Sequence, residues 1–191
     1  EMVKIDKIYT RGGDKGKTSL GDGKRLSKNS MRISSIGDVD ETNCAIGLAL
    51  TILNPEEEAA KVLSRVQNDL FDLGADLAIP GADINDGNLR IQKIQVTRLE
   101  EDIDSLNENL STLQSFILPG GAKSAAHIHA ARAIVRRAER SLIALAESEA
   151  VNQFALQYLN RLSDLLFVLA RTKNDFGKSE PLWVPGKNIK K

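Results

Sequence analysis

Five long segments of this chain repeat apolar residues every three or four positions, and this feature most constrains the fold. Such spacing gathers apolar side chains on one face of an α-helix. The segments cover residues 37–54, 55–79, 97–113, 124–149 and 152–175. Proline and glycine pairs separate several of them, and few stretches show the strict alternation of a β-strand. We therefore expect an all-α, five-helix up-down bundle.

Residues near the ends of these segments predict where helices start and stop. Capping-box patterns, Asp38 with Glu41 and Thr97 with Glu100, predict the starts of the first and third helices. Gly177 is expected to cap the fifth helix. The 191 residues fit a single domain, with an N-terminal loop region at 1–33, the bundle at 34–177 and a basic tail at 178–191.

The composition excludes several classes of partner. Lys plus Arg and Asp plus Glu both number 26, so no net field attracts nucleic acid. No apolar run approaches the roughly 20 residues of a membrane span. The single cysteine, Cys44, cannot form an internal disulfide, and its neighbours predict a small buried residue. We expect a cytoplasmic protein without a membrane or nucleic-acid partner; a transit peptide already removed stays open.

Residues 10–19 carry the composition of a phosphate-binding loop. They include three glycines, three cations and three hydroxyl side chains. Glycines let backbone N–H groups approach phosphate oxygens, while lysines neutralise their charge. The segment is not a Walker loop, because Arg11 stands where that motif requires glycine. A flexible polar turn is an equally compatible interpretation.

Arginines 132, 136 and 140 recur every fourth residue on the fourth predicted helix and so share one face. Like charges at this spacing repel, so carboxylates or a bound anion usually neutralise them. The alternative is a solvated face, with Arg137 and Glu139 in surface pairs. Acidic residues of the first helix could meet the row, and so could Asn160, although Asn160 could simply cross-link helices.

The two histidines do not indicate a metal site. His127 and His129 lie two residues apart and therefore face different sides of a helix. No Glu-x-x-His pair is present, which removes a di-iron bundle from consideration. We assign no residue as a metal ligand.

Five separated motifs, in order, resemble those of PduO-type ATP:cob(I)alamin adenosyltransferases across residues 9–171. They are Tyr-Thr-Arg-Gly-Gly-Asp-Lys-Gly at 9–16, Gly-Asp-Val-Asp-Glu-Thr-Asn at 37–43, Phe-Ile-Leu-Pro-Gly-Gly at 116–121, Arg-Arg-Ala-Glu-Arg at 136–140, and Tyr-Leu-Asn-Arg-Leu-Ser-Asp at 158–164. The resemblance implies a ferritin-like five-helix bundle that forms a homotrimer, with each active site between neighbouring subunits. It also implies transfer of the 5′-deoxyadenosyl group of ATP to cobalamin reduced to Co(I), with release of triphosphate and with Mg2+ on the phosphates.

The resemblance also implies a role for particular residues. ATP would contact one subunit through Thr10, Arg11, Gly12, Gly13, Thr18, Ser19 and Lys28. It would contact the neighbouring subunit through Arg136, Arg137, Ala138, Glu139, Arg140 and Asn160, with Arg32 nearby. Arg136, Glu139 and Asn160 would be catalytic. Asp40 and Arg132 would form a salt bridge across the interface beside the corrinoid, and Phe116 would displace the lower ligand of cobalt.

Two other functions remain compatible with the residues. The first is an ATP-sensing regulatory bundle without catalysis, and the second is a purely structural bundle in which Phe116 fills the core. If the protein is a transferase, a flavoprotein reductase and a cobalamin-dependent enzyme are its expected partners. The preferred corrinoid stays open.

Overall fold

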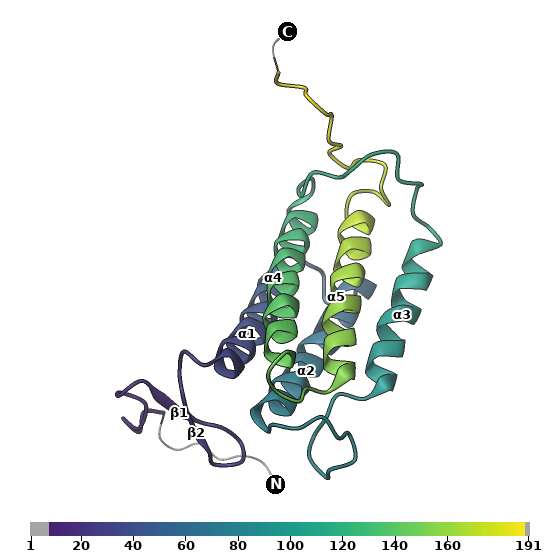
Figure 1. Ribbon diagram of the computed structural model, residues 1–191. Coiled ribbons are helices and arrows are strands. Elements are labelled where there is room, and N and C mark those ends of the chain that lie inside the picture. Colours follow the sequence, from purple (N-terminus) through teal and green to yellow (C-terminus); the bar gives the residue numbers. More distant parts are fainter. Residues whose placement is uncertain (1–7, 190–191) are drawn as a thin grey trace.

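The computed structural model describes residues 8–189 and consists mainly of five helices (Figure 1). These are α1 (Met31–Leu50), α2 (Glu58–Ala78), α3 (Lys93–Asn107), α4 (Lys123–Ala146) and α5 (Gln153–Thr172). A short antiparallel hairpin, β1 (Lys17–Ser19) with β2 (Arg25–Ser27), precedes them. The predicted all-α five-helix bundle is confirmed; the sequence patterns did not predict the hairpin.

The core lies where the apolar stripes of the helices meet. α1 packs against α2 and α4, and α5 packs against α4 and α3. The stripes predicted for α2, α4 and α5 are all buried, from Val62 to Leu77, from Ile128 to Leu145 and from Leu159 to Leu169. Burying each such side chain contributes about 1.5–3 kcal/mol, which makes these stripes the main source of stability.

The first helix begins earlier than predicted. It starts at Met31 after Ser30, so Asp38 and Glu41 lie inside it and the predicted capping box is wrong. The apolar pattern did not reveal this first part of the helix, because buried polar side chains attach it to the rest of the bundle. Arg32 is buried, donates to the Leu77 carbonyl at 2.9 Å and pairs with Glu149. Ser35 donates to the Ser141 carbonyl at 3.1 Å.

The ends of other helices also differ from prediction. α3 is capped by Gln92 with Gln95 rather than by Thr97 with Glu100, and it ends at Asn107, before the last residues of its predicted stripe. α5 ends at Thr172 with Lys173 as its C-cap. Gly177 therefore does not cap the helix. It follows in the next turn at a φ of 87°, where its N–H donates to the Arg171 carbonyl.

Two further predictions, both for residues on the outer side of α1, were wrong. Cys44 is exposed, because the helix turns Asn43 and Ala45 inward instead. Leu48 and Ile52, which belonged to the predicted stripe, are also exposed. In the part of the chain that the structure describes, no helix is both long and apolar enough to cross a membrane.

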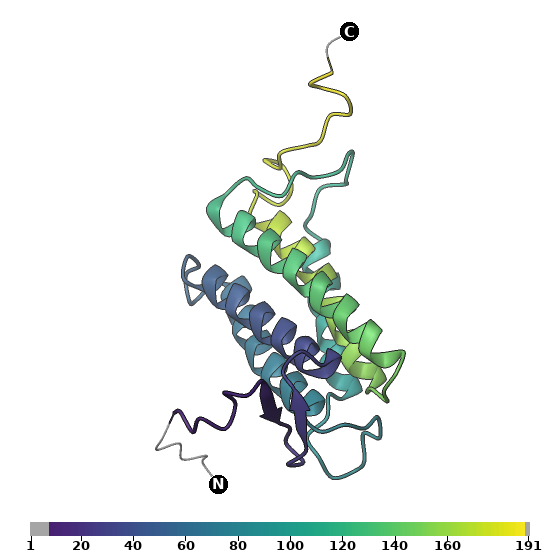
Figure 2. The same ribbon diagram turned by 60° about the vertical axis from the view of Figure 1, so that its left-hand side comes forward.

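The hairpin is attached to one end of the bundle, where α1 begins and α2 ends (Figure 2). Leu20 in its turn is buried, and the N–H of Gly21 donates to the Ala78 carbonyl at 2.8 Å. A side chain at position 21 would come within 3.0 Å of Ile79. This contact fixes the N-terminal loop against the bundle.

Candidate functional site

Arg25 holds the N-terminal loop over the hairpin. Its guanidinium donates to the Gly12 carbonyl at 2.6 Å, to the Lys17 carbonyl at 3.3 Å and to the Ser19 hydroxyl at 3.2 Å. Arg25 was not predicted from the sequence, because the role of Arg25 depends on a hairpin whose strands have only three residues each. These bonds give the loop proposed to bind phosphate a defined position over the hairpin.

The backbone of this loop lies close to the cationic group of Lys28. A side chain at Gly13 would come within 3.0 Å of the Lys28 ammonium group, which therefore lies directly over bare backbone. Arg11 has a φ of 59° and Gly16 a φ of 75°, and turns of this kind present successive N–H groups on one side. The Arg11 guanidinium stacks over the Tyr9 ring. Thr10, Thr18 and Ser19 complete the loop.

The arginine row on α4 has no acidic partner. Within residues 8–189 the structure contains no ion pair of Arg132, Arg136 or Arg140. Arg132 lies over the Phe167 ring at 5.8 Å, and its Nε is buried without a hydrogen-bond acceptor. Burial, and then the Arg136 charge, lower the pKa of Arg132. This face of α4 is suited to an anion.

Arg137 points away from that row, toward α1. It forms ion pairs with Asp38 and with Glu41. The Glu41 carboxylate is the main cause of a raised pKa of Arg137. Arg137 is thus the surface pair that the solvated-face interpretation expected. Ala138, the next residue, has its side chain in the core.

Glu139 and Asn160 are brought together from neighbouring helices. The Asn160 amide donates to Glu139 at 2.8 Å, while its oxygen accepts from Arg161 at 2.9 Å. Arg161 in turn donates to Glu100 on α3 at 2.8 Å. Asn160 and Glu139 are therefore fixed in orientation beside the arginine row.

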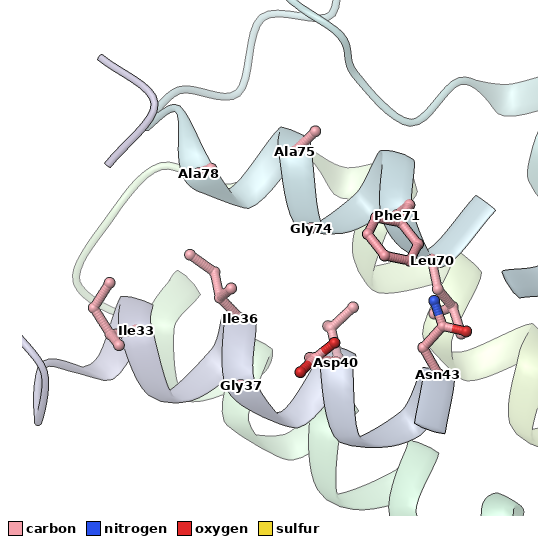
Figure 3. A pocket seen from close by; sticks show the side chains of 11 residues that line it. Ile33, Ile36, Gly37, Asp40, Asn43, Leu70, Phe71, Gly74, Ala75 and Ala78 are labelled. Atoms are coloured by element: carbon pink, nitrogen blue, oxygen red, sulfur yellow. The ribbon is translucent and has the colours of Figure 1, made fainter. Parts of the chain in front are cut away.

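Asp40 lies in a groove between α1 and α2. Arg132 lies on a different face of the bundle, between α4 and α5. The groove has a volume of about 540 Å3 and is mostly apolar, with Phe71 on its rim. Figure 3 shows Asp40 on α1 and Phe71 on the facing helix. Asp40 is exposed and makes no ion pair with Arg132 within the described chain. The predicted salt bridge would therefore require two copies.

Phe116 belongs to the loop between α3 and α4. This loop lies at the opposite end of the bundle from the hairpin (Figure 1). Its side chain is 78% exposed, so it does not fill the core as the structural alternative required. It contacts Trp183 of the tail edge to face, with ring centroids 6.0 Å apart. A single chain thus places the N-terminal loop and Phe116 at opposite ends.

The remaining polar candidates have structural roles. His127 is exposed whereas His129 is buried, as their spacing predicted. Arg32, expected near the nucleotide, is 2% exposed and is committed to Glu149 and Leu77. Among the described residues, no group of three or more His, Cys, Asp or Glu could hold a metal ion.

Comparison with known proteins identifies the family. The family profile "Cobalamin adenosyltransferase" matches residues 8–173. A cobalamin adenosyltransferase of Cupriavidus metallidurans is 49% identical over 94% of this chain and 95% of its own length. A corrinoid adenosyltransferase of Mycobacterium leprae is 46% identical over 96% and 98%, respectively.

A solved structure gives the same fold. It is a phenylalanine-to-alanine variant of a PduO-type ATP:corrinoid adenosyltransferase from Lactobacillus reuteri, complexed with cobalamin and ATP. The two structures share a TM-score of 0.85 and 37% identity, over 93% of this chain and 99% of that one. The chain therefore belongs to the PduO-type cobalamin adenosyltransferase family.

Proposed function

We propose that this protein transfers the 5′-deoxyadenosyl group of ATP to cobalamin reduced to Co(I), and releases triphosphate. The observation that carries the proposal is the row of Arg132, Arg136 and Arg140, which lacks any carboxylate partner within residues 8–189. Such a row destabilises its own helix unless an anion answers it. The Lactobacillus reuteri enzyme, complexed with cobalamin and ATP, supports the choice of both substrates.

The reaction is a substitution at the 5′ carbon of ATP. The electron pair of Co(I) forms the cobalt–carbon bond, and the bond from C5′ to the triphosphate oxygen breaks with its electrons on the triphosphate. Reduced cobalt needs no general base. The protein must instead align cobalt with carbon, exclude water and stabilise the charge that develops on the leaving group.

The residues divide between holding the triphosphate and stabilising its departure. The N-terminal loop, with Lys28 over Gly13, suits the first task because it combines an ammonium group with glycine backbone that a phosphate can approach closely. Arg136 suits the second because it is exposed and unpaired by any described acidic residue. Glu139, oriented by Asn160, would position the arginines or the ribose.

Magnesium would enter with the nucleotide. Mg2+ prefers oxygen ligands and commonly retains substrate phosphates and water rather than a protein cage. In this proposal the cation is held on ATP oxygens, with the hydroxyls of Thr18 and Ser19 as the nearest candidate protein contacts. Such a cation lowers the charge of the leaving triphosphate.

The complete site would lie between copies in a trimer. Arg132 has a buried Nε without an acceptor, and Asp40 lies exposed in the α1–α2 groove. Each is thus available to the other only from a neighbouring copy. The same assembly would bring the N-terminal loop of one copy to the arginine row of the next.

The test is to mix the protein with ATP, Mg2+ and chemically reduced cobalamin and to follow the absorbance of cobalt–carbon bond formation. We expect a product that requires ATP and forms together with triphosphate. ATP-dependent thermal stabilisation without product would indicate an ATP sensor instead. The absence of both product formation and thermal stabilisation by ATP would indicate a purely structural bundle.

A further inference from the structure

The C-terminal tail runs beside the loop that carries Phe116 and is bonded to it like a strand. The N–H of Trp183 donates to the Phe116 carbonyl at 2.8 Å, and the N–H of Leu118 donates to the Pro181 carbonyl at 2.7 Å. The hydroxyl of Ser115 donates to the Trp183 carbonyl at 2.8 Å. Figures 1 and 2 both show the tail beside this loop at the end of the bundle.

A buried ion pair anchors this tail just before the paired residues. Arg171, in the last turn of α5, donates to Glu180 at 2.7 Å, and their side chains are 5% and 3% exposed. The same guanidinium donates to the Ser111 carbonyl at 2.7 Å. Arg171 therefore fastens both the tail and the first part of the Phe116 loop to the bundle.

The anchoring matters because the middle of the loop, where Phe116 lies, has no regular secondary structure. Residues 108–122 lie between α3 and α4 and contain no helix or strand. The Phe116 ring is 78% exposed and packs edge to face against Trp183. Asn174, just after α5, holds the far side of the loop by donating to the Gly120 carbonyl and accepting from the Ala122 N–H. At Phe116 itself, the backbone bonds to the tail.

We propose that Glu180 is a positioning residue for Phe116: paired with Arg171, it holds the 181–183 segment against the loop and so keeps the Phe116 ring in place to displace the lower ligand of cobalt. This inference rests on the proposed function. It assigns to the tail a role in activating Co(II) and none in binding ATP.

The first measurement uses the single tryptophan of the chain, Trp183, as a probe of the tail. In Glu180→Gln the neutral amide no longer pairs with Arg171, and we expect red-shifted emission and stronger acrylamide quenching. The matched control is Glu57→Gln, because Glu57 also pairs with a basic residue at the end of α5, Lys173, but does not touch the tail. The control should leave the emission unchanged.

The second measurement separates positioning from stability. With ATP present, we expect Glu180→Gln to slow product formation from Co(II) cobalamin and a reductant by about tenfold, a factor equivalent to about 1.4 kcal/mol. The rate from chemically pre-reduced cobalamin should stay within about twofold of wild type, since cobalt already reduced to Co(I) no longer needs the displacement of its lower ligand that precedes reduction. Absorption spectra of bound Co(II) should show the lower ligand retained.

A milder variant distinguishes a positioning effect from an effect of misfolding. Ser115→Ala removes only the bond to the Trp183 carbonyl, so it should shift both measurements in the same direction with unchanged unfolding temperature. Unchanged tryptophan emission in Glu180→Gln, or equal losses from Co(II) and pre-reduced cobalamin, would overturn the inference. A wild-type protein that forms no product from either corrinoid would overturn the proposed function itself.

Discussion

Asn160 on α5 donates a 2.8 Å hydrogen bond to Glu139 on α4, and this bond joins two residues 21 positions apart beside the arginine row. The Asn160 oxygen accepts from Arg161, so the amide cannot turn over without losing both partners. An orienting pair of this kind fixes side chains before substrate binds, which is the form of preorganisation that substitution with a charged leaving group needs.

Arg136→Ala should lower the rate more than the affinity for ATP. Charge moves onto the bridging oxygen as triphosphate leaves, so the arginine is needed most in the transition state. Losing one preorganised donor typically costs about a hundred- to a thousand-fold in rate. Turnover and ATP affinity should be measured on variants shown to remain trimeric.

Arg137→Ala is the control within the same motif. Its side chain pairs with Asp38 and Glu41 on α1 rather than joining the row, so its effect on rate should be milder. A pure affinity defect in Arg136→Ala would make that residue an anchor for ATP. Wild-type activity there would contradict its assignment altogether.

Arg25→Ala should weaken ATP binding without unfolding the bundle. Its three contacts within the N-terminal loop and hairpin are exposed, and their loss frees the loop before ATP binds. We expect the Kd for ATP to rise about tenfold, measured by calorimetry. Lys24→Ala removes a neighbouring charge and its ion pair with Asp22 in the hairpin turn, but no contact to residues 10–19. An equal loss there would mean that charge alone matters.

Asp40→Asn should impair corrinoid turnover if Asp40 pairs with Arg132 of another copy. Arg132→Lys should also impair turnover, because lysine lacks the planar fork of arginine and cannot replace it in this pair. The exchanged variant, Asp40→Arg with Arg132→Asp, should recover part of the lost activity, measured as the rate of product formation. Single variants that behave like wild type, with no recovery in the exchange, would exclude the pair.

Phe116→Ala should leave the stability nearly unchanged, because the ring is 78% exposed. A surface substitution of this kind usually shifts stability by about 0.5 kcal/mol or less. The variant should react poorly from Co(II) with a reductant but much better from pre-reduced cobalamin. Rate assays with both corrinoids and a thermal melt test this. A large loss of stability with equal loss of both rates would point to a packing role.

His129 should make the protein less stable in mild acid. Burial, and then the Arg132 charge, lower the pKa of His129 to about 4, below the ordinary value of 6.5. The unfolded chain therefore binds the extra proton first, so stability is complete above about pH 6.5 and falls as pH drops toward 4. The loss between pH 7 and pH 5 should be about 1–2 kcal/mol.

Urea unfolding at both pH values and fixed protein concentration checks this. His129→Leu should remove that part of the pH dependence, since both ring nitrogens lack a hydrogen-bond partner among the described atoms. His127→Gln is the matched control, because His127 is the only other histidine of the chain and is exposed. An equal pH dependence in wild type and His129→Leu would contradict the assignment.

The sequence by itself determined the five helices and most of their buried faces. Stripes such as Val62 to Leu77 on α2 are periodic over neighbouring residues, so the pattern can be read without knowing the partner helix. The arginine row followed from the same periodicity. The family motifs identified the candidate residues, although not which of them a single chain brings together.

Only the tertiary structure decided where polar side chains find their partners. Arg32 extends α1 by reaching Glu149, Arg137 turns to α1, and Arg171 secures the tail through Glu180. These pairs join different elements, and α1 begins before its apolar stripe because buried polar contacts hold it. Local periodicity carries no record of such contacts, since a hydrogen bond depends on the position of both groups in the folded chain.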